Sequence, residues 1–299
     1  MTKETFTSVQ NEIKELLAEP RFRIKLYDYI KEKSDELIAN TSEELFSMNI
    51  PWDNNEFALR LKRYEGLSAD LLSIMSLVGY WGTVDHLPAV SISPKLFAAK
   101  LGKDSRSNNW TSLRWYPLML ITYALGIGAG EANNYPILNH FFQASSVKLP
   151  HATLRVPFVV ALEESFGTIR DSFRVLPDHE THRYPASEYL FRFFKDKFQD
   201  LIFLGDDYED IFDRLELIYS LQYAHEREKI YSGHVWGPMG RFGWKYSNGG
   251  DSNPFKLLCN DASSKRELWA PTKAGFFDGS YERFEKLTKQ YEQILQSIH

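Results

Sequence analysis

Cysteine is almost missing from this sequence of 299 residues, which contains Cys259 alone. A single cysteine cannot form a disulfide within the chain, and the sequence around it has no histidine or cysteine cluster with the spacing of zinc ligands. Such cysteine usage is typical of a reducing compartment. The first residues also lack the basic start and apolar run of a signal peptide, so we expect a cytoplasmic protein.

Long apolar runs are scarce too. One uncharged stretch, WYPLMLITYALGIGAG, lies between Arg114 and Glu131. It is shorter than the roughly 20 residues that a transmembrane helix needs, and it contains Pro117 and three glycines. We therefore expect a buried core helix here and no membrane partner.

Positive charge is not in excess either. The sequence has 35 lysines and arginines against 40 aspartates and glutamates, which gives a formal net charge of -5. This balance argues against an attraction of the whole surface to nucleic acid and leaves a local basic patch open. Hydrophobic residues make up 43% of the chain and charged residues 25%, as in an average globular protein, so the chain can bury a real core.

Apolar residues recur at helical spacing through nearly the whole chain. The stripes are Val9, Ile13, Leu16 and Leu17; Phe22, Leu26 and Ile30; Leu67, Leu71, Ile74, Met75 and Val78; Leu190, Phe194, Phe198 and Leu201; Ile211, Leu215, Ile218 and Tyr219; and Phe284, Leu287, Tyr291 and Leu295. Capping residues predict further helices over 93–102, from Asn134 through Phe142, and up to Gly167. The predicted fold is mainly α, a multi-helix globular bundle.

Two regions interrupt the helical pattern. Aromatic residues alternate around Gly-Pro and Gly-Gly in HVWGPMGRFGWKYSNGGDSNPF, which predicts a small irregular β-hairpin or structured loop near residues 234–256. The loop RVLPDHETHRYP contains two prolines and is the best candidate for a domain boundary. We therefore expect an N-terminal helical part at 1–175 and a C-terminal part at 176–299, with a single domain as the alternative.

No motif for nucleotide chemistry is present. The P-loop pattern GxxxxGK[ST] does not occur. Gly126, Gly128 and Gly130 resemble part of a dinucleotide-binding fingerprint, but that fingerprint follows a strand and opens a helix, whereas these glycines end an apolar helix. Glycines in such a place predict close packing between helices.

Metal-binding patterns are weak as well. Asp178, His179 and His182 do not have the spacing of the helical HExxH site, so a solvated loop is the simpler interpretation. An acidic run is typical of a hydrated helix start, although its carboxylates are of the type that binds magnesium. This run is Asp206, Asp207, Glu209, Asp210 and Asp213. We predict no catalytic residue, no metal and no cofactor.

Aromatic and arginine side chains are the candidates for binding, because these types are enriched at interface hot spots. The glycines and prolines near Trp236 favour a shaped loop, a common place for recognition. The predicted binding residues are Arg114, Trp115, Tyr116, Trp236, Arg241, Phe242 and Trp244.

Five strings give the chain a resemblance to a known group of proteins. They are LLAEPRFRIKLYDYIKEK (16–33), YEGLSADLLSIMSLVGYWG (64–82), LRWYPLMLITYALGIGAG (113–130), FDRLELIYSLQYA (212–224) and WGPMGRFGWKY (236–246). The chain resembles the helical C-terminal region of bacterial conflict, or anti-phage defence, proteins, where it commonly follows a sirtuin-like or nucleotide-binding effector domain. The resemblance implies a defence context and assigns no chemistry to any position. Since no effector domain precedes Leu16, it implies an effector on a separate chain, one removed from this chain, or none.

These observations favour a non-enzymatic sensor or scaffold subunit of a bacterial defence system that binds a separate effector protein or forms a homo-oligomer. Two alternatives stay open. One is a metal-dependent nuclease, or another enzyme with a dispersed active site, that uses the carboxylates near Asp207 or the histidines near His179. The other is a nucleic-acid-binding module with its cations on one face.

Overall fold

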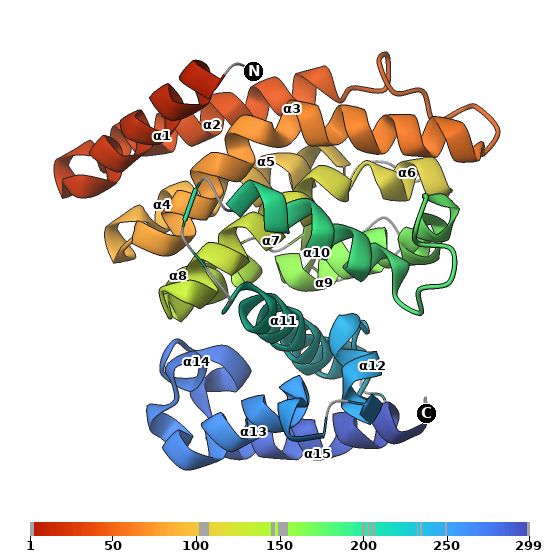
Figure 1. Ribbon diagram of the computed structural model, residues 1–299. Helices are drawn as coiled ribbons and strands as arrows, with labels where there is room; N and C mark the ends of the chain where they lie inside the picture. Colours follow the sequence, from red (N-terminus) through yellow and green to blue (C-terminus); the bar gives the residue numbers. More distant parts are fainter. Residues whose placement is uncertain are drawn as a thin grey trace. The chain divides into compact units, whose positions relative to one another are not determined.

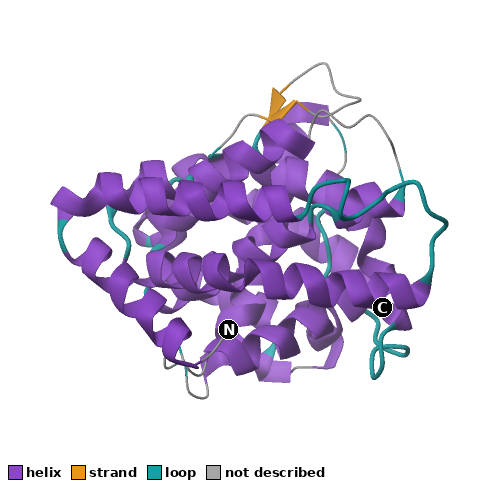
Figure 2. Cartoon of the chain, turned by 90° about the horizontal axis from the view of Figure 1, so that it is seen from above, coloured by secondary structure: helices purple, strands orange, loops and turns teal. Residues whose placement is uncertain are grey.

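A computed structural model describes residues 3–101, 108–144, 147–148, 155–198, 201–202, 204, 207–231, 233, 235–248 and 250–297. Helices dominate these residues, so the mainly α fold predicted from periodicity is confirmed (Figure 2). The chain divides into two compact units. Unit 1 comprises Met1–Arg170 and Lys197–Phe203, and unit 2 comprises Asp171–Asp196 and Leu204–His299. The prediction of domains with a boundary after residue 175 concerns independent folding and stays a prediction.

Unit 1 contains most of the helices (Figure 1). Its α-helices are α1 (Lys3–Ala18), α2 (Arg23–Asn40), α3 (Asn54–Trp81), α4 (Leu87–Val90), α5 (Ile92–Leu101), α6 (Asn109–Leu113), α7 (Tyr116–Glu131), α8 (Tyr135–Gln143) and α9 (Phe158–Phe166). Short 3-10 helices lie at Pro20–Phe22 and Val84–His86, and a third, Gly167–Val175, follows α9. Two short strands, β1 (Val147–Lys148) and β2 (Arg155–Val156), pair antiparallel, with Val147 opposite Val156.

Helix α7 is the core of unit 1. Every residue from Tyr116 to Ala129 is buried, which explains why this stretch carries no charge and shows no polar face. The prediction of a buried core helix is thus confirmed. Within the described residues, no helix combines the length and apolar character needed to cross a membrane.

Glycines let α3 and α7 approach each other closely. A Cβ atom on Gly79 of α3 would lie 2.3 Å from the Leu125 carbonyl oxygen, and one on Gly128 of α7 would lie 2.3 Å from the Ser76 carbonyl oxygen. Any larger residue at either position would push the two backbones apart. For Gly128, the predicted role in helix packing is confirmed.

The C-terminal end of α3 is fixed by a side chain from the α7–α8 connection. The Asn134 amide donates hydrogen bonds to the carbonyl oxygens of Gly79 at 3.0 Å and Gly82 at 2.8 Å. It thereby satisfies acceptors that a helix end leaves without an intrahelical partner.

Unit 2 is built around the long helix α11 (Tyr208–Tyr231). The other α-helices are α10 (Pro185–Phe198), whose last two residues belong to unit 1, α12 (Arg241–Asn248), α13 (Pro254–Lys265), α14 (Ala270–Lys273) and α15 (Tyr281–Ser297). Single 3-10 turns lie at Gly250–Ser252, Arg266–Leu268 and Phe276–Gly279. Helices α11, α13 and α15 contact one another, and Tyr291 of α15 brings its hydroxyl within 2.6 Å of the Ser220 hydroxyl on α11.

Of the two forms predicted near residues 234–256, a small irregular β-hairpin or a structured loop, the described residues of that region contain no strand and include an irregular segment. Residues 235–240 form an irregular segment, and helix α12 and the start of α13 follow. Two other glycines of this region are required by close neighbours. A Cβ on Gly240 would lie 2.0 Å from a Glu216 carboxylate oxygen, and one on Gly243 would lie 2.7 Å from the Tyr184 hydroxyl.

Candidate functional site

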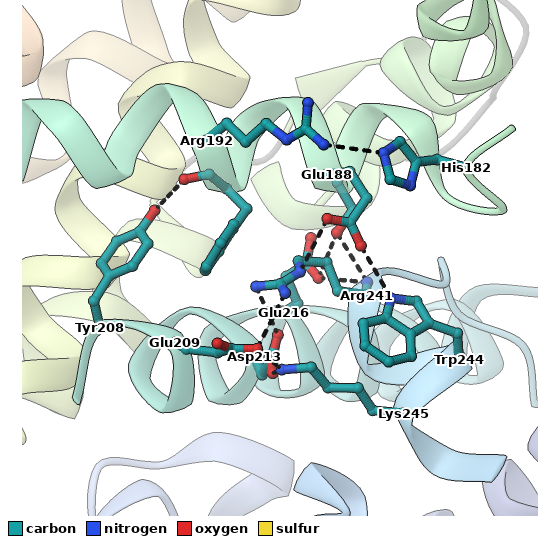
Figure 3. A network of polar contacts seen from close by, with 12 residues as sticks. His182, Glu188, Arg192, Tyr208, Glu209, Asp213, Glu216, Arg241, Trp244 and Lys245 are labelled. Carbon is teal, nitrogen blue, oxygen red and sulfur yellow. Dashed lines mark hydrogen bonds and ion pairs between the residues drawn. The ribbon is translucent and has the colours of Figure 1, made fainter. Parts of the chain in front are cut away.

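Three helices of unit 2 bring polar side chains together in what we call the Arg241 network (Figure 3). Its members are Ser187 and Glu188 of α10; Glu209, Asp213 and Glu216 of α11; and Arg241, Trp244 and Lys245 of α12. On α11 the carboxylates are spaced by four and three residues, and on α12 the members are spaced by three and one. Each set therefore shares one helix face.

Arg241 is the centre of this network. Its side chain is 7% exposed, and its nitrogens lie 3.3 Å from Glu188 Oε2 and 3.1 Å from Glu209 Oε1. A third carboxylate, Asp213, lies at 3.9 Å. The guanidinium carbon is 3.4 Å from the centre of the Phe191 ring. One cation thus serves three carboxylates and stacks on an aromatic face, which a planar guanidinium can do and an ammonium cannot.

Lys245 supplies the second positive charge. Its ammonium group contacts both Glu209 and Asp213, and the Asp213 side chain is fully buried. Burial raises the pKa of Asp213, while Lys245 and Arg241 oppose the increase. The hydrogen bond from Lys245 holds the pKa of the more exposed Glu209 below its ordinary value. A buried carboxylate in this setting depends on its cations, because an unpaired buried charge is costly.

The first turn of α12 is held by a second set of contacts. The Arg241 backbone N–H donates to Ser187 Oγ at 2.9 Å and to Glu216 Oε2 at 3.1 Å. Ser187 in turn donates to Glu216 at 2.8 Å. A carboxylate at the start of a helix is favourable because the N–H groups and the helix dipole point at it. These contacts, together with the ion pairs, fix α12 against α10 and α11.

Two of the predicted binding residues present exposed indole rings, and one of them, Trp244, belongs to the Arg241 network. Trp244 is 36% exposed, and its indole N–H donates to Glu188 Oε1 at 2.9 Å. Trp236 is 45% exposed and packs edge-to-face on Tyr223, with ring centres 5.8 Å apart. Phe242 is fully buried, so it supports the helix from inside.

The segment that carries Trp236 is anchored to the core of unit 2. Ser220 Oγ and the Tyr291 hydroxyl both donate to the Pro238 carbonyl oxygen, at 2.5 and 3.2 Å. A Cβ on Gly237 would lie 2.5 Å from the Ser220 carbonyl oxygen, so only glycine fits there. The Gly-Pro string is therefore a shaped segment held in one position.

The other predicted binding residues lie in unit 1, and their side chains are buried. Arg114, Trp115 and Tyr116 are 9%, 4% and 0% exposed. The Tyr116 hydroxyl donates to Glu65 Oε1 at 3.0 Å, and an Arg114 N–H points at the Met48 sulfur at 3.7 Å. These contacts stabilise the interior of unit 1 and leave little side-chain surface for a partner.

The histidines and acidic residues considered for metal binding do not converge. His179 is 5% exposed, its Nδ1 lies 2.7 Å from the Pro177 carbonyl oxygen, and burial lowers its pKa. His182 is in contact with Arg192. In the acidic run, Asp206 falls outside the described residues, and Asp213 pairs with Lys245 and Arg241. Over the described stretches, no group of three histidine, cysteine, aspartate or glutamate residues has an arrangement that would hold a metal ion.

A histidine–aspartate pair in unit 2 was missed by the sequence analysis. His225 accepts a hydrogen bond at Nδ1 from Arg283 at 3.0 Å, and its Nε2 lies 3.3 Å from Asp278 Oδ1. Phe277 and Asp278 hold left-handed backbone angles of +56° and +59°, a strained conformation for residues other than glycine. The flanking glycines of GFFDG were the available sequence signal. Because His225 is fully buried, a substrate cannot reach its ring.

Cys259 lies on α13 and is a weak nucleophile in this setting. Burial and, to a lesser extent, the nearby Glu292 carboxylate raise the pKa of its thiol to about 12, against a hydrogen bond with Thr288 that lowers it. The thiolate is the reactive form of cysteine, and little of it exists near neutral pH at such a pKa.

Comparisons with known proteins give this chain no relative. No protein-family model matches the sequence. No curated protein and no solved structure shows a significant similarity to it either.

Proposed function

We propose that this chain is a non-enzymatic sensor or scaffold subunit of a bacterial defence system, and that it binds a separate effector protein through Trp236 and Trp244 of unit 2. The observation that carries the proposal is the exposure of both indole rings on backbone that is rigidly held. Tryptophan is the residue type most enriched among interface hot spots, and an anchor that is already fixed loses little conformational entropy on binding.

The Arg241 network supports this role through what its charges do. Glu188 holds the indole N–H of Trp244 while it pairs with Arg241, so the network orients the ring and keeps its position. Glu209 and Asp213 are engaged by Lys245 in the same way. Because these carboxylates pair with groups of the same chain, their role is to hold the surface in its shape.

The defence context rests on the resemblance of the five hydrophobic strings, one of which is WGPMGRFGWKY at 236–246. That string contains Trp236 and Trp244, the glycine that admits Glu216, and the two cations of the Arg241 network. A surface that recruits an effector would explain why this string contains both the indole rings and the cations of the Arg241 network.

The test is reconstitution with proteins encoded by neighbouring genes. Each candidate is co-expressed with the full chain, the mass of the complex is measured by light scattering, and affinity is measured by calorimetry. We expect a defined complex that Trp236→Ala and Trp244→Ala each weaken by about 30-fold, the loss typical of a hot spot. Leu268→Ala, at a position 75% exposed and outside the string, is the matched control and should bind like the parent.

Three results would contradict the proposal. The first is a chain that forms no complex with any neighbouring product. The second is a complex whose affinity both tryptophan variants leave unchanged although they fold normally. The third is metal-dependent cleavage of nucleic acid that Asp207→Ala or His179→Ala abolishes in folded protein, since this would establish the nuclease alternative.

A further inference from the structure

Unit 1 contains a cavity of about 550 Å³ that is separate from the Arg241 network. Its lining comes from α1, from the end of α3 and from the segment at 201–202. The lining residues are Lys14, Leu17, Ala18, Tyr80, Trp81, Leu201 and Ile202. This volume falls within the range of roughly 300–1,000 Å³ found for small-molecule sites, which are likewise mainly apolar with a few polar groups.

An exposed aromatic pair forms one wall of the cavity. Trp81 is 57% exposed, and its ring meets that of Tyr80 edge-to-face at 4.6 Å. Both residues end α3, where the Asn134 amide bonds to the carbonyl oxygens of Gly79 and Gly82. The wall is therefore preformed, and a ligand that covered the Trp81 ring would remove apolar surface from water.

Helix α1 contributes the one formally charged residue of the lining, Lys14. Lys14, Leu17 and Ala18 are spaced by three and one along α1, so they share one helix face. No carboxylate is among the lining residues. Among the described residues, Lys14 has no recorded ion pair, so its ammonium group remains available to an anion.

We propose that this cavity binds a small amphipathic anion, an apolar chain or ring that ends in a carboxylate. The apolar body would lie against Leu17, Trp81 and Ile202, and the carboxylate would pair with Lys14. The proposal does not depend on effector binding, because it concerns different residues in the other unit.

Calorimetric titration of the full-length chain with decanoate tests it. Decan-1-ol and decyltrimethylammonium, which share the chain length and differ in the head group, are titrated in parallel. We expect one decanoate per chain, bound at least about tenfold more tightly than either analogue, because charge-assisted contacts are the stronger ones. Lys14→Ala should remove the preference over decan-1-ol, and Lys14→Arg should keep it.

Substitutions of the lining residues test whether decanoate binds in this cavity. Trp81→Ala should weaken decanoate binding by about tenfold or more through the lost apolar contact. Ala18→Phe places a ring in the cavity from an exposed position, so it should block binding without disturbing the core. Tyr231→Ala, at an aromatic residue 45% exposed in unit 2, is the matched control and should leave binding unchanged.

The proposal is overturned if decanoate does not bind, or if decan-1-ol binds as tightly as decanoate. It is also overturned if Ala18→Phe, with an unchanged circular dichroism spectrum and melting temperature, binds decanoate like the parent. Because Ala18→Phe leaves the aromatic pair intact, it gives an answer even if Trp81→Ala does not fold.

Discussion

Arg241 holds together carboxylates whose like charges would otherwise repel one another. Its guanidinium group lies near Glu188 and the fully buried Asp213, and it stacks on Phe191. Removing one partner of a buried ion pair leaves the other charge without compensation. Phe191 and Trp244 are recognisable in the sequence as large aromatics, but the pairing is not, because it joins helices that are far apart along the chain.

Arg241→Met should therefore lower the free energy of unfolding by about 3–5 kcal/mol, as measured by urea denaturation. Lys31→Met is the control. Lys31 pairs with Asp35 on an exposed helix face, with side chains 46% and 49% exposed, so its loss should change the free energy of unfolding little. A cost for Arg241→Met below about 1 kcal/mol would mean that the network does not stabilise unit 2.

Asp261 of α13 predicts a pH dependence of stability. Burial alone would raise its pKa, but hydrogen bonds from Lys265, Arg214 and Trp269 outweigh burial and hold the pKa at about 2. The folded state thus binds this proton less readily than the unfolded chain, whose aspartates titrate near pH 3.9. The carboxylate contributes stability above that pH, and the contribution is lost as the pH falls toward 2.

We expect the difference in unfolding free energy between the parent and Asp261→Asn to be constant above about pH 5 and to shrink as the pH is lowered. Urea denaturation at a series of pH values measures this difference. Asp171→Asn, at a carboxylate 86% exposed, should show a small difference that hardly changes with pH. If the difference in unfolding free energy for Asp261→Asn grows as the pH is lowered, the pairing does not lower the pKa of Asp261 and the prediction is wrong.

At the scale of the element, periodicity and capping residues predicted several helices well. Helix α8 begins and ends within one residue of the predicted range from Asn134 through Phe142, and α9 ends directly before the predicted stop at Gly167. Helix α3 begins at Asn54, well before Leu67, the first residue of its predicted apolar stripe, although the sequence contains a capping residue for this start. Asp53 caps it by accepting the Glu56 N–H at 2.8 Å.

The structural role of some glycines could be predicted from the sequence, and that of others could not. Gly128 was assigned to helix packing because it lay in an apolar helix, and the structure agrees. Gly240 and Gly243 lie in the string where Gly-Pro and Gly-Gly predicted turns, and their own role, to accommodate Glu216 and Tyr184, was not predicted. A tertiary neighbour and a turn both demand a residue without a side chain, and the local sequence does not distinguish them. The burial of Arg114 and Trp115 could not be predicted for the same reason, because it depends on residues that are distant in the sequence.

Two glycine substitutions should have opposite effects on unit 1. Gly128→Ala places a methyl group 2.3 Å from the Ser76 carbonyl oxygen and should cost about 1–3 kcal/mol or more. Gly66→Ala, on α3, meets nothing within 4 Å and should stabilise the protein by about 0.5–1 kcal/mol, because alanine favours the helix. Thermal and urea unfolding measure both. Equal effects of the two changes would contradict a close α3–α7 contact.

At the scale of the whole molecule, neither unit is a single stretch of chain. Unit 1 is left at Arg170 and entered again at Lys197 for the short segment that ends at Phe203. That segment includes Ile202, which lines the cavity with Leu17 and Trp81. A chain that is truncated between Arg170 and Lys197 therefore lacks a segment that belongs to unit 1.

The fragment 1–175, which corresponds to the predicted N-terminal domain, should be less stable than unit 1 in the full chain. We expect it to aggregate during size-exclusion chromatography and to melt at a lower temperature, because surface that Ile202 covers becomes exposed. Adding the segment back by expressing residues 1–204 should improve both properties. A monomeric 1–175 fragment with the melting behaviour of the full chain would show that the segment contributes nothing.

The same discontinuity sets an order of events during synthesis. Translation at about 5–20 residues per second takes roughly 2–7 s to proceed from Arg170 to Phe203, and in that interval the nascent unit 1 lacks its last segment. Its hydrophobic surface stays open to water or to a chaperone on the ribosome until the segment emerges, and by then the first helix of unit 2 has already been made.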